Sequence, residues 1–285
     1  MFRMRSLYSI LFGALVACLS SNAFAFSKQE MGTVINLAGK QRMLTQKMSK
    51  EILLIAKGVD ADANKANLQK TAALFDKTLK GLVNGDPDLG LPKTTDPAIL
   101  NQLGKVSELW STFKQNVDAV LAGKIDKEVL TRVATQNLPL LKNMNKAVQM
   151  YAKMSGSKLE PAMATTINLA GKQRMLTQKM TKELLLIANG IDVDANTANL
   201  KKTAALFERT LKGLLDGDQT LGLPGTKDPA IRAQLGAVQK LWAEYKPVLD
   251  KVDTSPAGLA KAAKLNLPLL KEMNKAVKMY EKSVK

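Results

Sequence analysis

The 285-residue chain has no histidine and one cysteine, which excludes most transition-metal sites and catalytic sites that depend on an imidazole or a thiolate in the folded part. Its formal net charge of +17 predicts anionic partners, although solvated lysine-rich helix faces also produce such a charge. Aromatic residues make up 5% of the chain without alternating with basic ones, which argues against nucleic-acid binding. We expect a protein that is not an enzyme and uses no metal or cofactor.

The first 25 residues have the composition of an export signal. Arg3 and Arg5 precede an apolar run that starts at Leu7, and residues 23–25 fit a small-x-small cleavage site. We therefore predict a signal peptide over residues 1–25 and a periplasmic protein secreted through the Sec pathway. Cys18 leaves an alternative open, because residues 15–18 resemble a lipobox and the acylated cysteine would anchor a lipoprotein to the membrane.

The rest of the chain is a duplication. The segment INLAGKQRMLTQKM occupies residues 35–48 and again residues 167–180, without a change. The offset between matching residues is 132 as far as Trp110 and Trp242, and 129 afterwards, so that one loop is shorter and the rest is in register. A period of this length indicates a duplicated domain. We assign copy 1 to residues 26–156 and copy 2 to residues 157–285.

Apolar residues recur with helical spacing in both copies, which predicts an all-α fold of two tandem four-helix up-down bundles. Glycines, and aspartate or serine followed by proline, mark the expected ends. The helices expected in copy 1 are 28–57, 62–84, 96–122 and 127–155, and those in copy 2 are 161–189, 194–216, 228–250 and 256–283.

Prolines and tryptophans within these helices carry further expectations. Pro139 and Pro268 should kink the fourth helix of each copy or leave carbonyl groups for other donors. Trp110 and Trp242 are interpreted as packing residues rather than as a ligand-stacking platform. The linker contains Gly156 and precedes Pro161; if these break the helix the bundles lie side by side, and if the helix continues they stack end to end. We favour the side-by-side arrangement.

The repeated segment has two faces on a helical wheel. Leu37, Leu44 and Met48 form a stripe that faces the core of the bundle. A glycine inside a helix costs about 1 kcal/mol relative to alanine and usually permits close approach of a backbone or a ligand. The second face is therefore a predicted contact face, made of the small and polar residues Ala38, Gly39, Arg42, Thr45, Gln46 and Ser49.

Arginine is retained in both copies only at Arg42 and Arg174. A planar, permanently charged guanidinium suits bidentate binding of a flat oxyanion or a carboxylate. The alternative is a structural ion pair with a nearby acid such as Glu51 or Glu183. If the first helices of the two bundles touch, both arginines meet across a pseudo-two-fold axis and repel unless an anion lies between them. This geometry predicts one small anion shared by the two copies.

The segment Ile35–Gln46, repeated at Ile167–Gln178, resembles the I-N-x-A-G-x-x-R-M-x-x-Q signature of PilJ-type sensor domains from type IV pilus chemoreceptors, which are related to the sensor module of the nitrate receptors NarX and NarQ. The resemblance implies a four-helix bundle in which the arginine from each of two subunits holds one anion. Residues 40–44 are closer to the pilus-receptor pattern, so nitrate itself is not implied. The candidate ligand-binding residues are Arg42, Arg174, Gly39, Gly171, Asn36, Asn168, Gln46 and Gln178.

Two functions follow from this sequence. The first is a periplasmic sensor-type binding protein that holds a small anion and acts through a membrane receptor or kinase, because the printed sequence continues into no signalling region. The second is a non-catalytic envelope adaptor that uses the bundles as a docking surface. In the adaptor the arginines would pair with acids, and the positive charge would favour an anionic envelope surface.

Overall fold

The computed structural model describes residues 26–155 and 159–284. This part of the chain contains eight α-helices and two short 3-10 turns. The ends of the α-helices fall within one residue of the expected ones. The all-α prediction is confirmed. In chain order the elements are α1 (Lys28–Ala56), α2 (Ala61–Asn84), η1 (Pro87–Leu89), α3 (Pro97–Leu121), α4 (Lys127–Met154), α5 (Pro161–Ala188), α6 (Val193–Asp216), η3 (Gln219–Leu221), α7 (Pro229–Asp250) and α8 (Pro256–Lys282).

Local capping explains why the helix ends were predictable. Ser27 and Glu30 form a capping box at the start of α1, in which each side chain accepts a hydrogen bond from the other residue's backbone. Asp96 accepts from the backbone of Ile99, and Pro97 occupies the first position of α3, where its missing N–H costs nothing. The ends are thus encoded locally, before any tertiary contact forms.

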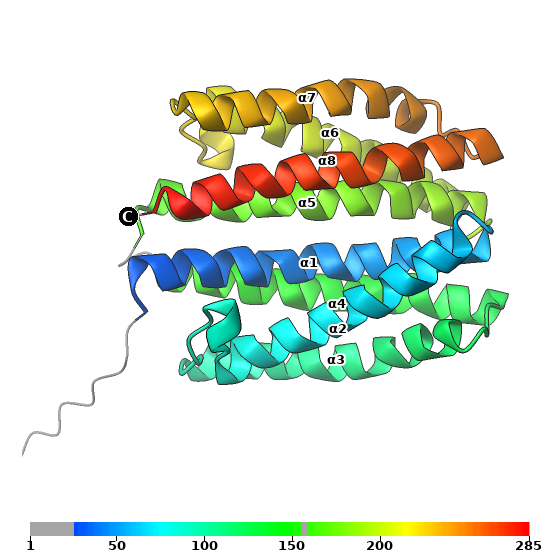
Figure 1. Cartoon of the computed structure of the whole chain (residues 1–285), viewed down its shortest axis with the longest axis horizontal. Coiled ribbons are helices and arrows are strands. Elements are labelled where there is room, and N and C mark those ends of the chain that lie inside the picture. Colours follow the sequence, from blue (N-terminus) through cyan, green and yellow to red (C-terminus); the bar gives the residue numbers. More distant parts are fainter. Residues whose placement is uncertain (1–25, 156–158, 285) are drawn as a thin grey trace, which may run out of the picture.

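The two four-helix bundles lie side by side, as the helix breakers in the linker predicted (Figure 1). Helices α1 and α5 start at the same end of the molecule and run parallel through its centre, packed on each other. Helices α4 and α8 flank this pair, and α2, α3, α6 and α7 form the outer layers. Pro161 is the first residue of α5, whereas Gly156 lies outside the described residues.

Helix α1 is buried on nearly every side because its own bundle covers one face and α5 covers another. Ala38 is 0% exposed, and Leu44 is 2% exposed. Leu37 packs against the hydrophobic core, as expected, but it is only partly buried. A helical wheel gives the direction of Leu37 but not the place where neighbouring helices stop covering it.

Pro139 and Pro268 lie inside helices that continue through them, α4 and α8. Each proline removes the hydrogen bond to the carbonyl four residues earlier, at Thr135 and Lys264. Both of these residues are exposed, and a solvent-facing carbonyl can bond to water without a protein donor.

The tryptophans are packing residues. Trp110 is 4% exposed and its ring centroid lies 4.6 Å from that of Phe75. Trp242 repeats this contact with Phe207 at 4.7 Å in the second bundle. The indole nitrogen of Trp110 donates to Asp76 Oδ1 at 3.2 Å, as a buried indole requires.

Within residues 26–155 and 159–284, none of the helices combines the length and the apolar character needed to cross a lipid bilayer. The predicted signal peptide over residues 1–25 and the alternative lipid anchor at Cys18 lie outside the described residues.

Candidate functional site

Two buried arginines cross the contact between α1 and α5. Arg42 Nη2 donates to the carbonyl oxygen of Asn168 at 3.0 Å, and Arg174 Nη2 donates to the carbonyl oxygen of Asn36 at 3.0 Å. Each arginine is 1% exposed. The bonds are reciprocal, as expected for a pseudo-two-fold axis between the copies, so the structure brings the two predicted arginines together.

Asparagines on the fourth helix of each copy orient the guanidinium groups. Arg42 Nη1 donates to Asn145 Oδ1 on α4 at 2.8 Å, and Arg174 Nη1 donates to Asn274 Oδ1 on α8 at 2.8 Å. The Nε atom of each arginine is buried without a hydrogen-bond partner among the described residues. Neutral oxygens thus hold both guanidinium groups, and neither forms an ion pair within the described residues.

The alternative of arginine–glutamate ion pairs is wrong. Glu51 pairs with Lys47, one turn away on α1, and Glu183 pairs with Lys179 in the same way on α5. Within the described residues, no carboxylate lies within ion-pair distance of Arg42. A lysine four residues before each glutamate is on the same helical face and reaches its carboxylate first.

Gly39 and Gly171 make room for both guanidinium groups. A Cβ atom on Gly39 would lie 3.3 Å from Arg42 Nη2 and 3.8 Å from Arg174 Nη2. A Cβ atom on Gly171 would lie 3.4 Å from Arg174 Nη2 and 3.7 Å from Arg42 Nη2. Both glycines therefore line the point where the two forks meet, which explains why glycine is used in mid-helix at these positions.

The site is strongly electropositive. Burial, and then the positive charge of Arg174, lower the pKa of Arg42 to about 9. Burial lowers the pKa of Arg174 to about 10. Lys40 and Lys172 lie close enough to feel the same positive field. Burial, and then the charge of the arginine of the other copy, lower the pKa of each lysine. Uncompensated buried charge of one sign is costly, so the chemical complement of this site is an anion.

Asn36 and Asn168 contribute to the site through their backbone carbonyls, and among the described residues Asn36 also bonds through its side chain whereas Asn168 does not. Asn36 Nδ2 donates to Glu281 Oε2 at 2.5 Å. The position that matches Glu281 in copy 1 is Ala152. The two halves of the site therefore differ by one acid, which also acts to raise the pKa of Arg174 against the larger effect of burial.

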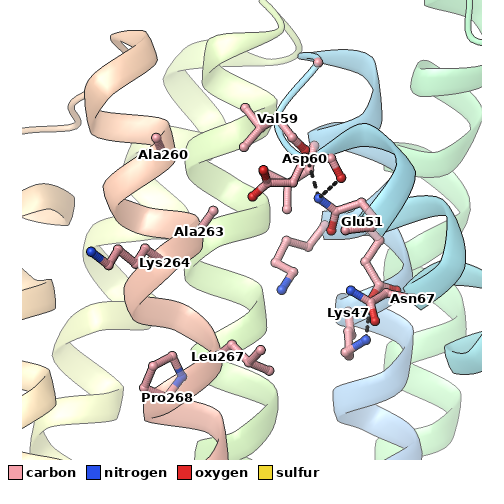
Figure 2. A pocket seen from close by; sticks show the side chains of 15 residues that line it. Lys47, Glu51, Val59, Asp60, Asn67, Ala260, Ala263, Lys264, Leu267 and Pro268 are labelled. Carbon is pink, nitrogen blue, oxygen red and sulfur yellow. Dashed lines mark hydrogen bonds and ion pairs between the residues drawn. The ribbon is translucent and has the colours of Figure 1, made fainter.

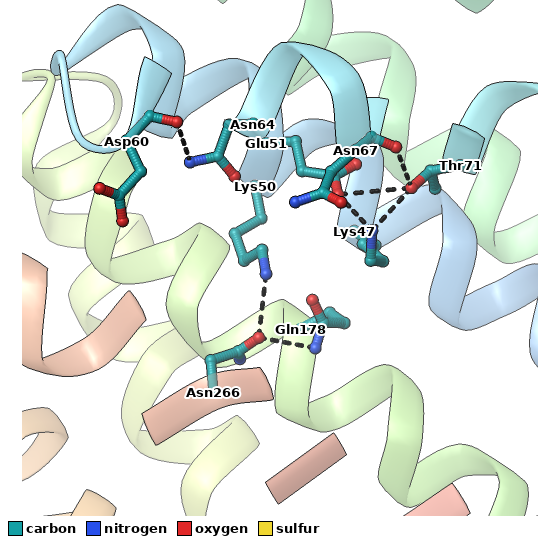
Figure 3. Close-up of polar contacts among 9 residues, drawn as sticks. All are labelled: Lys47, Lys50, Glu51, Asp60, Asn64, Asn67, Thr71, Gln178 and Asn266. Carbon is teal, nitrogen blue, oxygen red and sulfur yellow. Dashed lines mark hydrogen bonds and ion pairs between the residues drawn. The ribbon is translucent and has the colours of Figure 1, made fainter. Parts of the chain in front are cut away.

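Gln46 and Gln178 belong to a second polar layer, one helical turn from the arginines. Gln46 Nε2 donates to Asn137 Oδ1 at 2.8 Å. Gln178 Nε2 donates to Asn266 Oδ1 at 2.8 Å, as Figure 3 shows. Both amide oxygens are buried without a partner among the described residues. No hydrogen bond in the described part joins either glutamine to an arginine, so the two layers are distinct.

Lysines bridge the copies in this second layer. Lys50 Nζ donates to Asn266 Oδ1 at 3.0 Å, and Lys182 Nζ donates to Asn137 Oδ1 at 3.2 Å. These lysines were not among the predicted site residues, nor were Asn145 and Asn274. A signal existed, because residues 137–151 and 266–280 repeat the same asparagines, but only the tertiary structure shows that those asparagines face α1 and α5.

Comparison with known protein families shows to which family this chain belongs. The family model for the N-terminal region of the type IV pili methyl-accepting chemotaxis transducer, PilJ, matches residues 24–135 and again residues 160–266. The chain belongs to the PilJ family. One matched segment lies in each half of the chain, so the chain carries the PilJ region twice.

Curated relatives of this PilJ-family chain are chemotaxis proteins. The chain is 32% identical over 139 residues to the methyl-accepting chemotaxis protein McpN of Pseudomonas aeruginosa, a match that covers 48% of the chain and 25% of McpN. It is 23% identical over 228 residues to the putative methyl-accepting chemotaxis AlkN of Alcanivorax borkumensis, covering 78% of the chain and 31% of AlkN. Protein PilJ of Pseudomonas aeruginosa is 24% identical over 227 residues, covering 78% and 32%. The chain thus spans between a quarter and a third of the length of these relatives.

Proposed function

We propose that this PilJ-family chain is an exported periplasmic sensor protein that binds one small anion between its two copies. The anion is a nitrate- or nitrite-like oxyanion or a small carboxylate. Arg42 and Arg174 each contribute one guanidinium group, and Gly39 and Gly171 line the site. In this proposal the two copies are tandem domains that act as a covalent pseudo-dimer, and residues 1–25 are the export signal.

The observation that supports the proposal is the facing pair of buried arginines without an acidic partner. Arginine retains its positive charge near neutral pH, and the pKa values of about 9 and about 10 keep both Arg42 and Arg174 protonated there. The forks are already held by Asn145 and Asn274. An anion would therefore gain charge-assisted hydrogen bonds at a small cost in ordering.

Binding offers a way to signal. An anion between the forks removes the repulsion across the contact between α1 and α5 and draws these helices together. Helix shifts of about 1–2 Å are a common output of such contacts. Because the relatives are named as chemotaxis proteins, we propose that a membrane receptor or kinase reads the shift. The proposed kinship with the nitrate receptors would make an oxyanion the first ligand to test.

Thermal unfolding with added anions tests this function. Nitrate, nitrite and acetate are titrated against the protein, and a ligand present at 100 times its dissociation constant should stabilise it by about 2.7 kcal/mol. Arg42→Ala and Arg174→Ala should lose this stabilisation. Arg209→Ala is the matched control, because Arg209 is an exposed arginine paired with Asp218.

The same measurement separates the alternative. If none of the three anions stabilises the protein, the anion-binding function is contradicted. The remaining candidate would then be an envelope adaptor that docks through its helical surface.

A further inference from the structure

A hollow between the two copies lies apart from Arg42 and Arg174. It has a volume of about 860 Å³ and opens between α1 and the start of α2 on one wall and α8 on the other (Figure 2). Lys50 on its lining is eight residues along α1 from Arg42, which corresponds to about 12 Å of helix. A hollow of this size is within the usual range of ligand pockets.

Lys50 forms part of the lining with unused hydrogen-bonding capacity. It is 6% exposed, and its ammonium group donates to the neutral amide oxygen of Asn266 at 3.0 Å. An ammonium has three donors, and no carboxylate of the described residues lies within ion-pair distance of Lys50. Burial lowers its pKa to about 8 although the charge of the neighbouring Glu51 acts to raise it, so the ammonium group is poorly solvated where it lies.

Glu51, the next residue, also lines the hollow and is 1% exposed. Its Oε1 atom interacts with Lys47 and accepts a hydrogen bond from Thr71 (Figure 3). Its Oε2 atom is buried and has no hydrogen-bond partner among the described residues. Burial raises the pKa of this carboxyl group. A native structure rarely leaves such an atom unpaired, so Glu51 brings a carboxylate with one unpaired acceptor to the lining of the hollow.

Asp60 adds a second carboxylate at the rim. It precedes α2 with a left-handed backbone (φ of 43°), and its side chain makes no capping hydrogen bond. The carboxylate points into the space between α2 and α8 (Figure 2). Ala260, Ala263 and Leu267 of α8 supply an apolar surface opposite these charges.

The charges decide the class of ligand. A simple anion would meet Glu51 and Asp60, and a simple cation would meet Lys50 and Lys264. A solute with both charges satisfies both sides. We propose that the hollow binds a zwitterion of amino-acid or dipeptide size, with its carboxylate on Lys50, its ammonium group on Glu51 Oε2 and Asp60, and its apolar side chain against α8. This site is independent of the anion site at Arg42.

Calorimetric titration with three related probes tests the proposal. Glycyl-L-leucine carries both charges, N-acetylglycyl-L-leucine keeps only the carboxylate, and glycyl-L-leucinamide keeps only the ammonium group. We expect glycyl-L-leucine to bind, and each blocked form to bind at least about tenfold more weakly because one charged contact is lost. No heat from glycyl-L-leucine, or equal binding of a blocked form, would overturn the proposal.

Variants locate the site. Lys50→Met keeps the apolar stem and removes the charge, and Asp60→Asn keeps a residue that tolerates the left-handed backbone, so at least one of the two folds normally. Each should weaken binding of glycyl-L-leucine by about tenfold or more. Arg209→Ala, which changes an exposed arginine of copy 2 paired with Asp218, should leave it unchanged. Undiminished binding in both Lys50→Met and Asp60→Asn would overturn the assignment.

Discussion

Arg42 and Arg174 are held by each other's helices: each donates through Nη2, at 3.0 Å, to a backbone carbonyl of the opposite copy. The relationship ties charge and architecture together, because neither guanidinium has its full set of contacts unless both copies are in place. It also makes the proposed anion site a property of the contact between α1 and α5. Changes on either helix should therefore affect the whole site.

Filling the glycine positions should block the anion site. The double variant Gly39→Ala and Gly171→Ala places methyl groups 3.3 Å and 3.4 Å from the nearest guanidinium nitrogens. We expect anion affinity to fall by about tenfold or more, which corresponds to at least about 1.4 kcal/mol. The fold should survive, because alanine favours a helix by about 1 kcal/mol over glycine. Calorimetry and circular dichroism measure the two effects, and unchanged affinity would contradict the role of the glycines.

A carboxylate introduced beside Arg42 should take over the role of the bound anion in neutralising its charge. Asn145→Asp puts a carboxylate where a neutral amide oxygen now accepts from Arg42 Nη1 at 2.8 Å. The resulting charge-assisted hydrogen bond should stabilise the protein by about 1–3 kcal/mol, and the stabilisation by added anion should shrink. Urea unfolding with and without the anion tests both effects. An undiminished response to the anion would show that the charge of Arg42 is not what the anion neutralises.

Glu281, which copy 1 replaces with Ala152, should oppose anion binding. Glu281 contacts Asn36 and acts to raise the pKa of Arg174, so its charge offsets part of the positive field. Glu281→Gln should tighten anion binding by about threefold to tenfold. Ala152→Glu places an acid at the matching position of copy 1 and should weaken binding. Equal affinities for the two variants in titrations would contradict this account.

The buried lysines should make stability rise in mild alkali. Burial lowers the pKa of Lys50 and Lys182 to about 8 from 10.5, so above about pH 8 the unfolded chain binds more protons than the folded one. The free energy of unfolding should therefore increase between about pH 8 and 10, by up to about 1.4 kcal/mol per pH unit for each lysine. The increase in the free energy of unfolding from these lysines is complete above their unfolded pKa of 10.5 and absent well below pH 8.

Urea unfolding at several pH values checks this prediction. The double variant Lys50→Met and Lys182→Met should show a smaller rise, because Arg42, Lys40 and Lys172, whose pKa values burial also lowers, keep their share of it. Lys264→Met, at an exposed position, should keep the full rise. A wild-type profile that is flat or falling relative to the double variant would contradict the burial of charged lysines.

Much of the fold was predictable because its determinants are local. Ser27 with Glu30 and Asp96 with Pro97 define helix starts by backbone capping, and these signals are visible in the sequence. Gly39 and Gly171 predicted a contact face, since glycine in mid-helix implies close approach of a backbone or a ligand. The side-by-side arrangement was favoured from the breakers in the linker, and contact between the first helices was a condition of the shared site rather than a prediction. Arg42 and Arg174 stood out because arginine recurs in both copies only there.

The remaining features depend on neighbours that periodicity does not identify. Glu51 was a plausible partner for Arg42, but Lys47 on the same face reaches it first. Asn145 lies 103 positions from Arg42, and its orientation follows from how α4 packs on α1. Leu37 faces the expected direction yet lies where no helix fully covers it. Long-range packing decides all three cases.

Calorimetric stoichiometry with a bound anion tests the central claim most directly. The protein is titrated with the anion that gives the largest thermal stabilisation, beside Arg42→Ala and Arg174→Ala. A site shared between the copies predicts one anion per chain and loss of binding in either single variant. Two anions per chain, or one site that survives in each single variant, would contradict a shared site and assign an independent anion to each copy.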